Sequence, residues 1–146
     1  MSKTNAMENG ILELVFKNTD FANIGDAGGL QNSASAGNLY FSLHTSDPGE
    51  AGDQTTNETA YTSYARVAVA RSGSGFTVSG NSVSPAANVD FPECTGSAGA
   101  AITHFGVGTA SSGAGVLLYK GTVTPNITMA TGVIPRLKTT TAITED

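Results

Sequence analysis

The sequence is poor in several residue types that common functional sites require. It has one cysteine, no tryptophan and two histidines among its 146 residues. A single cysteine excludes an internal disulfide framework and a cysteine-based zinc site. No apolar run approaches the ~20 residues that a membrane-spanning helix needs. Disulfide-stapled, zinc-ribbon and helical membrane proteins are therefore excluded.

Charge is also scarce, and basic residues are the scarcest. Charged residues make up 13% of the chain, and seven Lys and Arg against twelve Asp and Glu give a net charge of −5. Nucleic-acid-binding proteins gain most of their affinity from cations clustered against phosphates, and these few cations are spread along the chain. We therefore expect neither a nucleic-acid partner nor binding to an anionic membrane. So few surface charges are typical of a protein packed against neighbours, although a soluble domain rich in Thr and Ser would look similar.

Small neutral residues replace the missing charge, and apolar residues alternate between them. The chain has 18 Gly, together with 14 Ser and 19 Thr. Gly costs about 1 kcal/mol at a helix position and Thr is stiff at χ1, so this composition disfavours long helices. Period-2 or short apolar runs separated by turn residues lie at 39–44, 64–71, 76–79, around 83, at 89–91, 102–107, 116–119 and in the tail 137–143. One or two more strands are expected over 123–134, interrupted by Pro125 and Pro135, and proline within a strand pattern predicts an edge position. About eight short strands predict an all-β fold, for which a jelly-roll-like β-sandwich is our first choice.

The first 37 residues differ from this pattern. Ile11 to Phe16 is the densest apolar run, and although a strand is possible, helical spacing with Met7 favours a short helix. Asn5 and Glu8 have capping-box spacing, and we expect the helix to end near Asn18. The Gly-, Ala- and Ser-rich stretch that follows predicts a loop or arm. We therefore divide the chain into an N-terminal arm over 1–37 and a β-sandwich domain over 38–146. The first nine residues lack a signal-peptide layout, so we expect assembly in the cytoplasm.

No residue pattern predicts catalysis, a cofactor or a metal site. His44 and His104 each lie in a strand-like run, without a G-x-S-x-G elbow or an H-x-x-x-H spacing. Calcium prefers oxygen ligands, and an acidic loop offers four carboxylates at Asp47, Glu50, Asp53 and Glu58. Their spacing does not match that of an EF-hand. A solvated, turn-rich loop is the favoured interpretation. We expect a protein that is not an enzyme.

Three further features have ordinary structural explanations. Gly106 and Gly108 do not complete a nucleotide-binding glycine pattern, so we interpret them as hairpin glycines. Cys94 has no basic neighbour in sequence that would activate it, which predicts a buried thiol. Tyr61 and Tyr64 near Arg66 could form a stacked aromatic–cation patch at an interface, or an ordinary strand edge.

Several segments taken together resemble a family of small virion proteins of tailed bacteriophages. The resemblance covers residues 39 to about 125 and is carried by the segments LHTSDPGE (43–50), YTSYAR (61–66), FPECTG (91–96), HFGVGT (104–109) and GVLLYKG (115–121). Members of that family are labelled either head decoration (cement) proteins or tail fibre proteins. The resemblance implies a structural virion protein without catalytic activity.

Two roles follow from this resemblance. In the first, a dimeric or trimeric cement protein binds the major capsid protein on the capsid exterior, and the predicted partner interface is the apolar segment Ile11, Leu14, Val15 and Phe16. These four side chains could instead cover the domain's own core. In the second, the chain is a tail fibre, adaptor or receptor-facing protein, and exposed loops such as 45–60 touch host glycan or protein. A small hydrolase or a sugar-binding lectin is a third possibility, and the lack of tryptophan argues mildly against the lectin.

Overall fold

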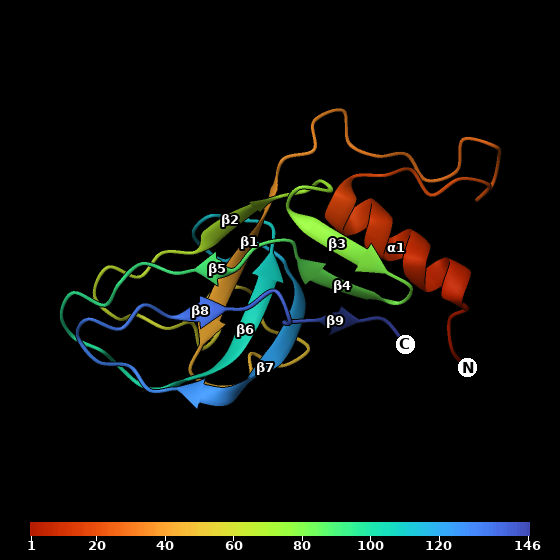
Figure 1. Ribbon diagram of the computed structural model, residues 1–146. Helices are drawn as coiled ribbons and strands as arrows, with labels where there is room; N and C mark the ends of the chain where they lie inside the picture. Colours follow the sequence, from red (N-terminus) through yellow and green to blue (C-terminus); the bar gives the residue numbers. More distant parts are fainter. The chain divides into compact units, whose positions relative to one another are not determined.

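The computed structural model describes residues Met1–Asp146, which form one helix and nine strands (Figure 1). The elements are α1 (Asn5–Lys17), β1 (Asn38–His44), β2 (Val67–Ala70), β3 (Phe76–Ser79), β4 (Ser82–Pro85), β5 (Val89–Asp90), β6 (Ile102–Gly108), β7 (Leu117–Ile127), β8 (Arg136–Leu137) and β9 (Ile143–Thr144). The strands form sheets ordered β2–β1–β6–β7, β3–β4–β9 and β5–β8. The predicted all-β fold with an N-terminal helix is confirmed and is consistent with a sandwich, whereas jelly-roll connectivity is not confirmed. The single helix is too short to cross a membrane.

The residues group into two compact units, and neither unit is continuous in sequence. Unit 1 comprises Met1–Asn38, Val69–Asn88 and Lys138–Asp146, and unit 2 comprises Leu39–Ala68 and Val89–Leu137. Each unit has buried apolar side chains of its own, described below. The sequence-based boundary between an arm and a domain at residue 37/38 stays a prediction.

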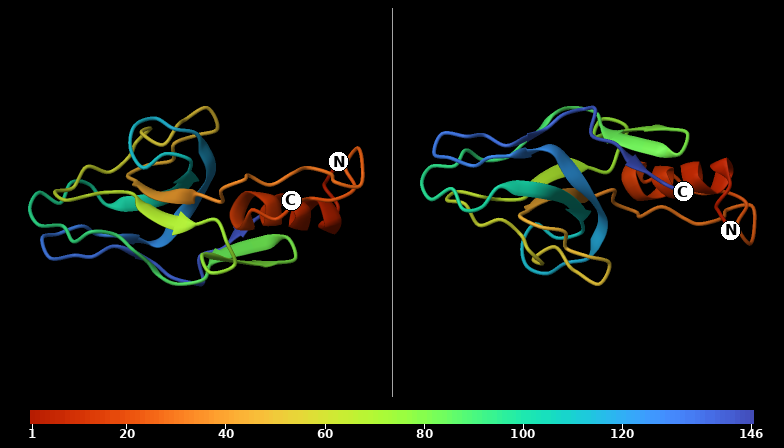
Figure 2. Two further views of the ribbon diagram at one scale, coloured as in Figure 1. Left: turned by 90° about the horizontal axis from the view of Figure 1, so that it is seen from above. Right: turned by 90° about the horizontal axis from the view of Figure 1, so that it is seen from below.

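In unit 1, helix α1 lies beside the hairpin formed by β3 and β4 (Figures 1 and 2). The ring of Phe16 meets Phe76 edge to face, with centroids 5.0 Å apart and planes at 69°. Leu12 is also fully buried on this face. The glycine inside the helix has a packing reason, because a Cβ on Gly10 would lie 2.4 Å from the ring of Phe21.

The two ends of α1 are stabilised differently. The N-cap is Thr4 and it makes no side-chain capping bond, so the capping box expected for Asn5 and Glu8 is wrong. At the other end, Asn18 adopts a left-handed conformation with φ 56°, which Asn tolerates better than most residues. Arg71 then donates from Nε to the carbonyl of Val15 at 2.7 Å and from Nη2 to the carbonyl of Leu14 at 2.8 Å. A cation here satisfies carbonyls that the helix itself leaves without partners.

Unit 2 is built on the antiparallel pairing of β1, β6 and β7. Leu43 pairs with Phe105 across β1 and β6, and the rings of Phe41 and Phe105 stack with centroids 6.4 Å apart. Strand β7 has 11 residues and ends the sheet order, so it is an edge strand. It runs through Pro125 without a break, whereas the sequence predicted separate strands there. The edge position expected from the proline is correct, because an edge strand can spare one backbone donor.

Candidate functional site

The acidic loop, defined here as residues 45–60, is shaped by its own carboxylates. Asp47 Oδ1 accepts the backbone N–H of Gly49 at 2.8 Å, and Gly49 has φ 75°, which closes the turn. Asp53 Oδ1 accepts both the hydroxyl of Thr55 at 2.6 Å and its backbone N–H at 2.8 Å. These bonds, the hydroxyl bond first, lower the pKa of Asp53. The predicted turn-rich loop is therefore confirmed, with two of its carboxylates bonded to the loop's own backbone.

A buried ion pair closes the base of this loop. Arg66 Nε and Nη2 contact the two carboxylate oxygens of Glu58, each at 2.7 Å, and the two side chains are 3% and 15% exposed. The hydroxyl of Tyr64 donates to Glu58 at 2.7 Å, and burial raises the pKa of this tyrosine. The bonds to Glu58 raise the pKa of Arg66. Tyr61 and Tyr64 meet edge to face at 5.3 Å, while the guanidinium is held by the carboxylate.

The same guanidinium also fastens the loop between β6 and β7, residues 109–116. Arg66 Nη1 donates to the carbonyl of Ala110 at 2.9 Å and Nη2 donates to the carbonyl of Gly113 at 2.8 Å. Gln54, which is fully buried, accepts the N–H of Ala110 at 2.9 Å. Its backbone N–H donates to the carbonyl of Ala114 at 2.9 Å. Hydrogen bonds of Arg66 and Gln54 thus connect the acidic loop to a second loop that is distant in sequence.

Glycine is required where Gln54 packs. A Cβ on Gly108 would lie 2.2 Å from Cδ of Gln54, and one on Gly106 would lie 2.6 Å from Leu117. Both glycines lie inside strand β6, so the hairpin-glycine interpretation is wrong for them. Their function is to let the neighbouring side chains approach the sheet closely. The Nε2 atom of Gln54 has no hydrogen-bond partner although it is buried.

The two histidines are register partners on β1 and β6. His44 is fully buried, its Nδ1 lies 2.8 Å from the carbonyl of Thr56 and its Nε2 lies 2.9 Å from Oγ of Ser42. Burial lowers the pKa of His44. His104 contacts the hydroxyl of Thr103 through Nδ1 at 2.8 Å. Nδ1 of His44 therefore holds the acidic loop against β1, while Nε2 is occupied by Ser42 of the same strand.

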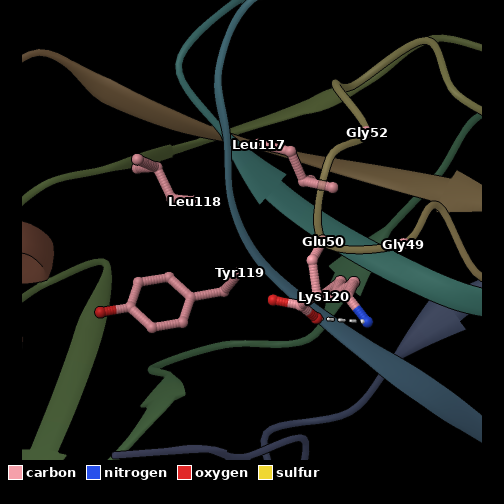
Figure 3. A pocket seen from close by; sticks show the side chains of 7 residues that line it. All are labelled: Gly49, Glu50, Gly52, Leu117, Leu118, Tyr119 and Lys120. Atoms are coloured by element: carbon pink, nitrogen blue, oxygen red, sulfur yellow. Dashed lines mark ion pairs between the residues drawn. The ribbon is translucent and has the colours of Figure 1, made fainter.

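A pocket of about 330 Å³ lies between the acidic loop and the start of β7. It is lined by Gly49, Glu50, Gly52, Leu117, Leu118, Tyr119 and Lys120 (Figure 3). Lys120 Nζ lies 3.1 Å from a carboxylate oxygen of Asp47 and 3.1 Å from one of Glu50. These contacts, that to Glu50 first, raise the pKa of Lys120. The pKa of Asp47 is lowered, first by the Gly49 N–H and then by Lys120.

The predicted partner segment belongs to unit 1, whereas the residues just described belong to unit 2. Phe16 is fully buried against Phe76, and Ile11, Leu14 and Val15 are half-buried. Their role in binding a partner stays a prediction.

Sequence reasoning missed the functions of Gln54 and Lys120 and the pairing of Glu58 with Arg66. Local spacing gives no sign of these contacts, since Gln54 and Ala110 are 56 residues apart. Cys94 has the predicted buried, free thiol.

Comparison with known families adds one finding. The chain matches, over residues 2–144, the family described as "Podophage GP4 fiber I protein gp80". No match was found among the curated proteins.

Proposed function

The chain belongs to the family of the podophage GP4 fiber I protein gp80, and from this premise we propose that it is a structural subunit of a tail fibre. Membership of this family makes the chain a structural phage virion protein of fibre type. The match over residues 2–144 is the observation that carries the proposal. A capsid cement role, with the major capsid protein as partner, has no such support, and the fibre alternative is the better reading.

The loop architecture of unit 2 fits a protein that presents a fixed surface. Arg66 bonds to Glu58 in the acidic loop and to two carbonyls in loop 109–116, so the two loops are held in one arrangement. Binding to loops that are already ordered avoids the entropy of immobilising them. A rigid scaffold that positions surface loops is the usual way in which binding residues are presented.

The buried polar groups fit a structural function better than a catalytic one. Ser42 and His44 are hydrogen-bonded to each other, and both are fully buried. The second nitrogen of His44 is occupied by the carbonyl of Thr56. A nucleophile and base pair needs access to a substrate, which these two side chains lack. The proposed subunit therefore acts by binding, and its low charge fits packing against other virion proteins, including further copies of itself.

Location within the particle tests the proposal directly. Virions are separated into tailless heads and isolated tails, and the chain is quantified in each fraction by mass spectrometry against known head and tail proteins. We expect the chain in the tail fraction, at a copy number that matches fibre components. Recovery in tailless heads, at a copy number that follows the major capsid protein, would instead establish the cement role.

A further inference from the structure

The free edge of strand β3 is a feature of unit 1 that has no role in the fibre proposal so far. We propose that this edge pairs antiparallel with the same edge of a second copy of the chain, across a two-fold axis at Val78. The sheet of unit 1 then continues through both copies in the order β9–β4–β3–β3–β4–β9. This inference goes beyond the fibre function, because it specifies a contact between copies and does not depend on where the chain is found in the particle.

Strand β3 ends the sheet β3–β4–β9, and its outer edge lacks the usual protection against pairing. Exposed strand edges are normally protected by charged side chains, proline or bulges. Residues 72–89, which include the whole β3–β4 hairpin, contain no charged side chain, and β3 pairs with β4 without a register shift. Every other end strand carries or adjoins a charged residue: Arg66 and Arg71 beside β2, Lys120 in β7, Glu145 beside β9, Asp90 in β5 and Arg136 in β8. An edge in this condition is one that another strand can cover.

The geometry of the hairpin determines which backbone groups of β3 point outward. Ser79 and Ser82 flank the two-residue turn, so they form a hydrogen-bonded pair. Bonded and non-bonded pairs alternate along antiparallel strands, so Val78 and Val83 form a non-bonded pair. Pro85, which has no N–H, lies at a non-bonded position, as this pattern requires. The N–H and C=O of Val78 therefore point away from β4, towards the free edge.

These two backbone groups of Val78 are complementary to those of an identical strand. With a two-fold axis at Val78, each copy donates its Val78 N–H to the Val78 carbonyl of the other copy, which makes a hydrogen-bonded pair. The same axis places Thr77 opposite Ser79 of the other copy as a non-bonded pair. Main-chain hydrogen bonds of this kind provide the affinity when a strand is added to an exposed sheet edge. The pairing breaks no hydrogen bond between β3 and β4.

The side chains of this sheet favour a second copy over a charged partner. Phe76 is on the face that packs against α1, and Figure 2 shows the helix on one side of the hairpin and no segment of unit 1 on the other. Directly opposed residues share a face, and on the outer face the register brings together only hydroxyl side chains: Thr77 with Ser84, Ser79 with Ser82, and Ser82 with Thr144. Across a two-fold axis a surface meets its own copy, so charges on it would repel each other. A face of hydroxyl groups avoids this repulsion.

The first test measures the oligomeric state of the full chain by sedimentation velocity, at concentrations from about 1 µM to 1 mM, the range of weak complexes. A strand of four residues gives a small interface, so we expect a dimer that dissociates on dilution. Thr77→Lys adds a charge to the exposed edge and should be monomeric where the wild type is dimeric. The matched control Thr144→Lys adds the same charge to the same face, two strands away from the edge, and should dimerise like the wild type. Circular dichroism verifies that both variants are folded.

The second test traps the register with disulfides, in chains that carry Cys94→Ala to remove the native thiol. Residues opposed in a non-bonded pair have Cα atoms about 4.5 Å apart, which a disulfide can bridge. Thr77→Cys chains and Ser79→Cys chains are oxidised separately and as an equal mixture. We expect the mixture to give more disulfide-linked dimer than either variant alone.

Three outcomes would overturn the inference: a wild type that stays monomeric at the highest concentration, equal association of Thr77→Lys and Thr144→Lys, or no excess of linked dimer in the mixture. None of these outcomes affects the fibre proposal, which depends on where the chain is found in the particle. Conversely, recovery of the chain from tailless heads would remove the fibre role and leave the pairing of β3 between copies unchanged.

Discussion

Replacing Arg66 with methionine is the sharpest test of the loop architecture. The Arg66 side chain is 3% exposed, and its guanidinium holds Glu58 through two bonds of 2.7 Å and donates to the carbonyls of Ala110 and Gly113. Arg66→Met leaves the Glu58 carboxylate without its cationic partner and removes the hydrogen-bond donors to both carbonyls. Breaking a buried ion pair on one side costs about 3–5 kcal/mol. This is a large part of the ~5–15 kcal/mol by which a domain is usually stable.

The measurement is the free energy of unfolding by urea denaturation. With an m-value of about 2 kcal/mol/M, a loss of about 3–5 kcal/mol lowers the midpoint by roughly 1.5–2.5 M. The double variant Arg66→Met/Glu58→Gln should recover part of the loss, because the stranded charge is gone, with a coupling energy of about 1–3 kcal/mol. Arg136→Met removes an ion pair with Asp90 in which both side chains are about half exposed, and it should leave the midpoint unchanged. A loss below ~1 kcal/mol for Arg66→Met, or strict additivity in the double variant, would refute the reasoning.

Three further predictions concern single residues. Gly108→Ala places a Cβ 2.2 Å from Gln54 and should lower the free energy of unfolding, measured by urea denaturation, by about 1–3 kcal/mol. Gly73→Ala, where the nearest atom would be 3.9 Å away, should leave it unchanged. Equal effects of the two substitutions would contradict the packing role of Gly108. Burial holds the pKa of His44 in the folded protein below its ordinary value of 6.5. Between the folded and the unfolded pKa the unfolded state binds more protons, so the free energy of unfolding should fall as the pH drops from about 7 to 5. His44→Gln should flatten that slope in pH-dependent denaturation, and an unchanged slope would assign the effect elsewhere. Cys94 is fully buried, so its thiol should react with Ellman's reagent only after unfolding, and fast native reaction would show that the site opens.

Local patterns predicted the strands but not which of their polar residues are buried. Leu39, Phe41 and Leu43 alternate as expected and are buried in β1. Period-2 alternation is typical of a strand with one face exposed to solvent, yet Ser42 and His44 on the opposite face are also fully buried. They are covered because the acidic loop folds back and bonds to His44 through the carbonyl of Thr56. A polar face covered by backbone has the same period-2 signature as one covered by water, so alternation alone cannot distinguish them.

The candidate site was only partly predictable for a related reason. The sequence identified the acidic loop as rich in turns and the neighbourhood of Arg66. It did not identify Lys120 as a partner of the loop, since the two are joined only when β7 pairs with β6 and the loop folds towards that strand. Contacts of this kind depend on strand order and register, which residue spacing within a segment does not encode.

The interleaving of the two units bears on how the chain is made. Unit 1 cannot be complete until its last segment, Lys138–Asp146, has been synthesised, because β9 supplies the partner of Val83 in β4 at Ile143. During translation, β4 and the residues of unit 2 before and after it leave the ribosome while the edge of β4 that pairs with β9 is still without its partner. Pairing between such distant segments folds slowly and exposes strand edges on the way. No uninterrupted fragment contains either unit alone, so recombinant study of one unit requires rejoined segments rather than a truncation.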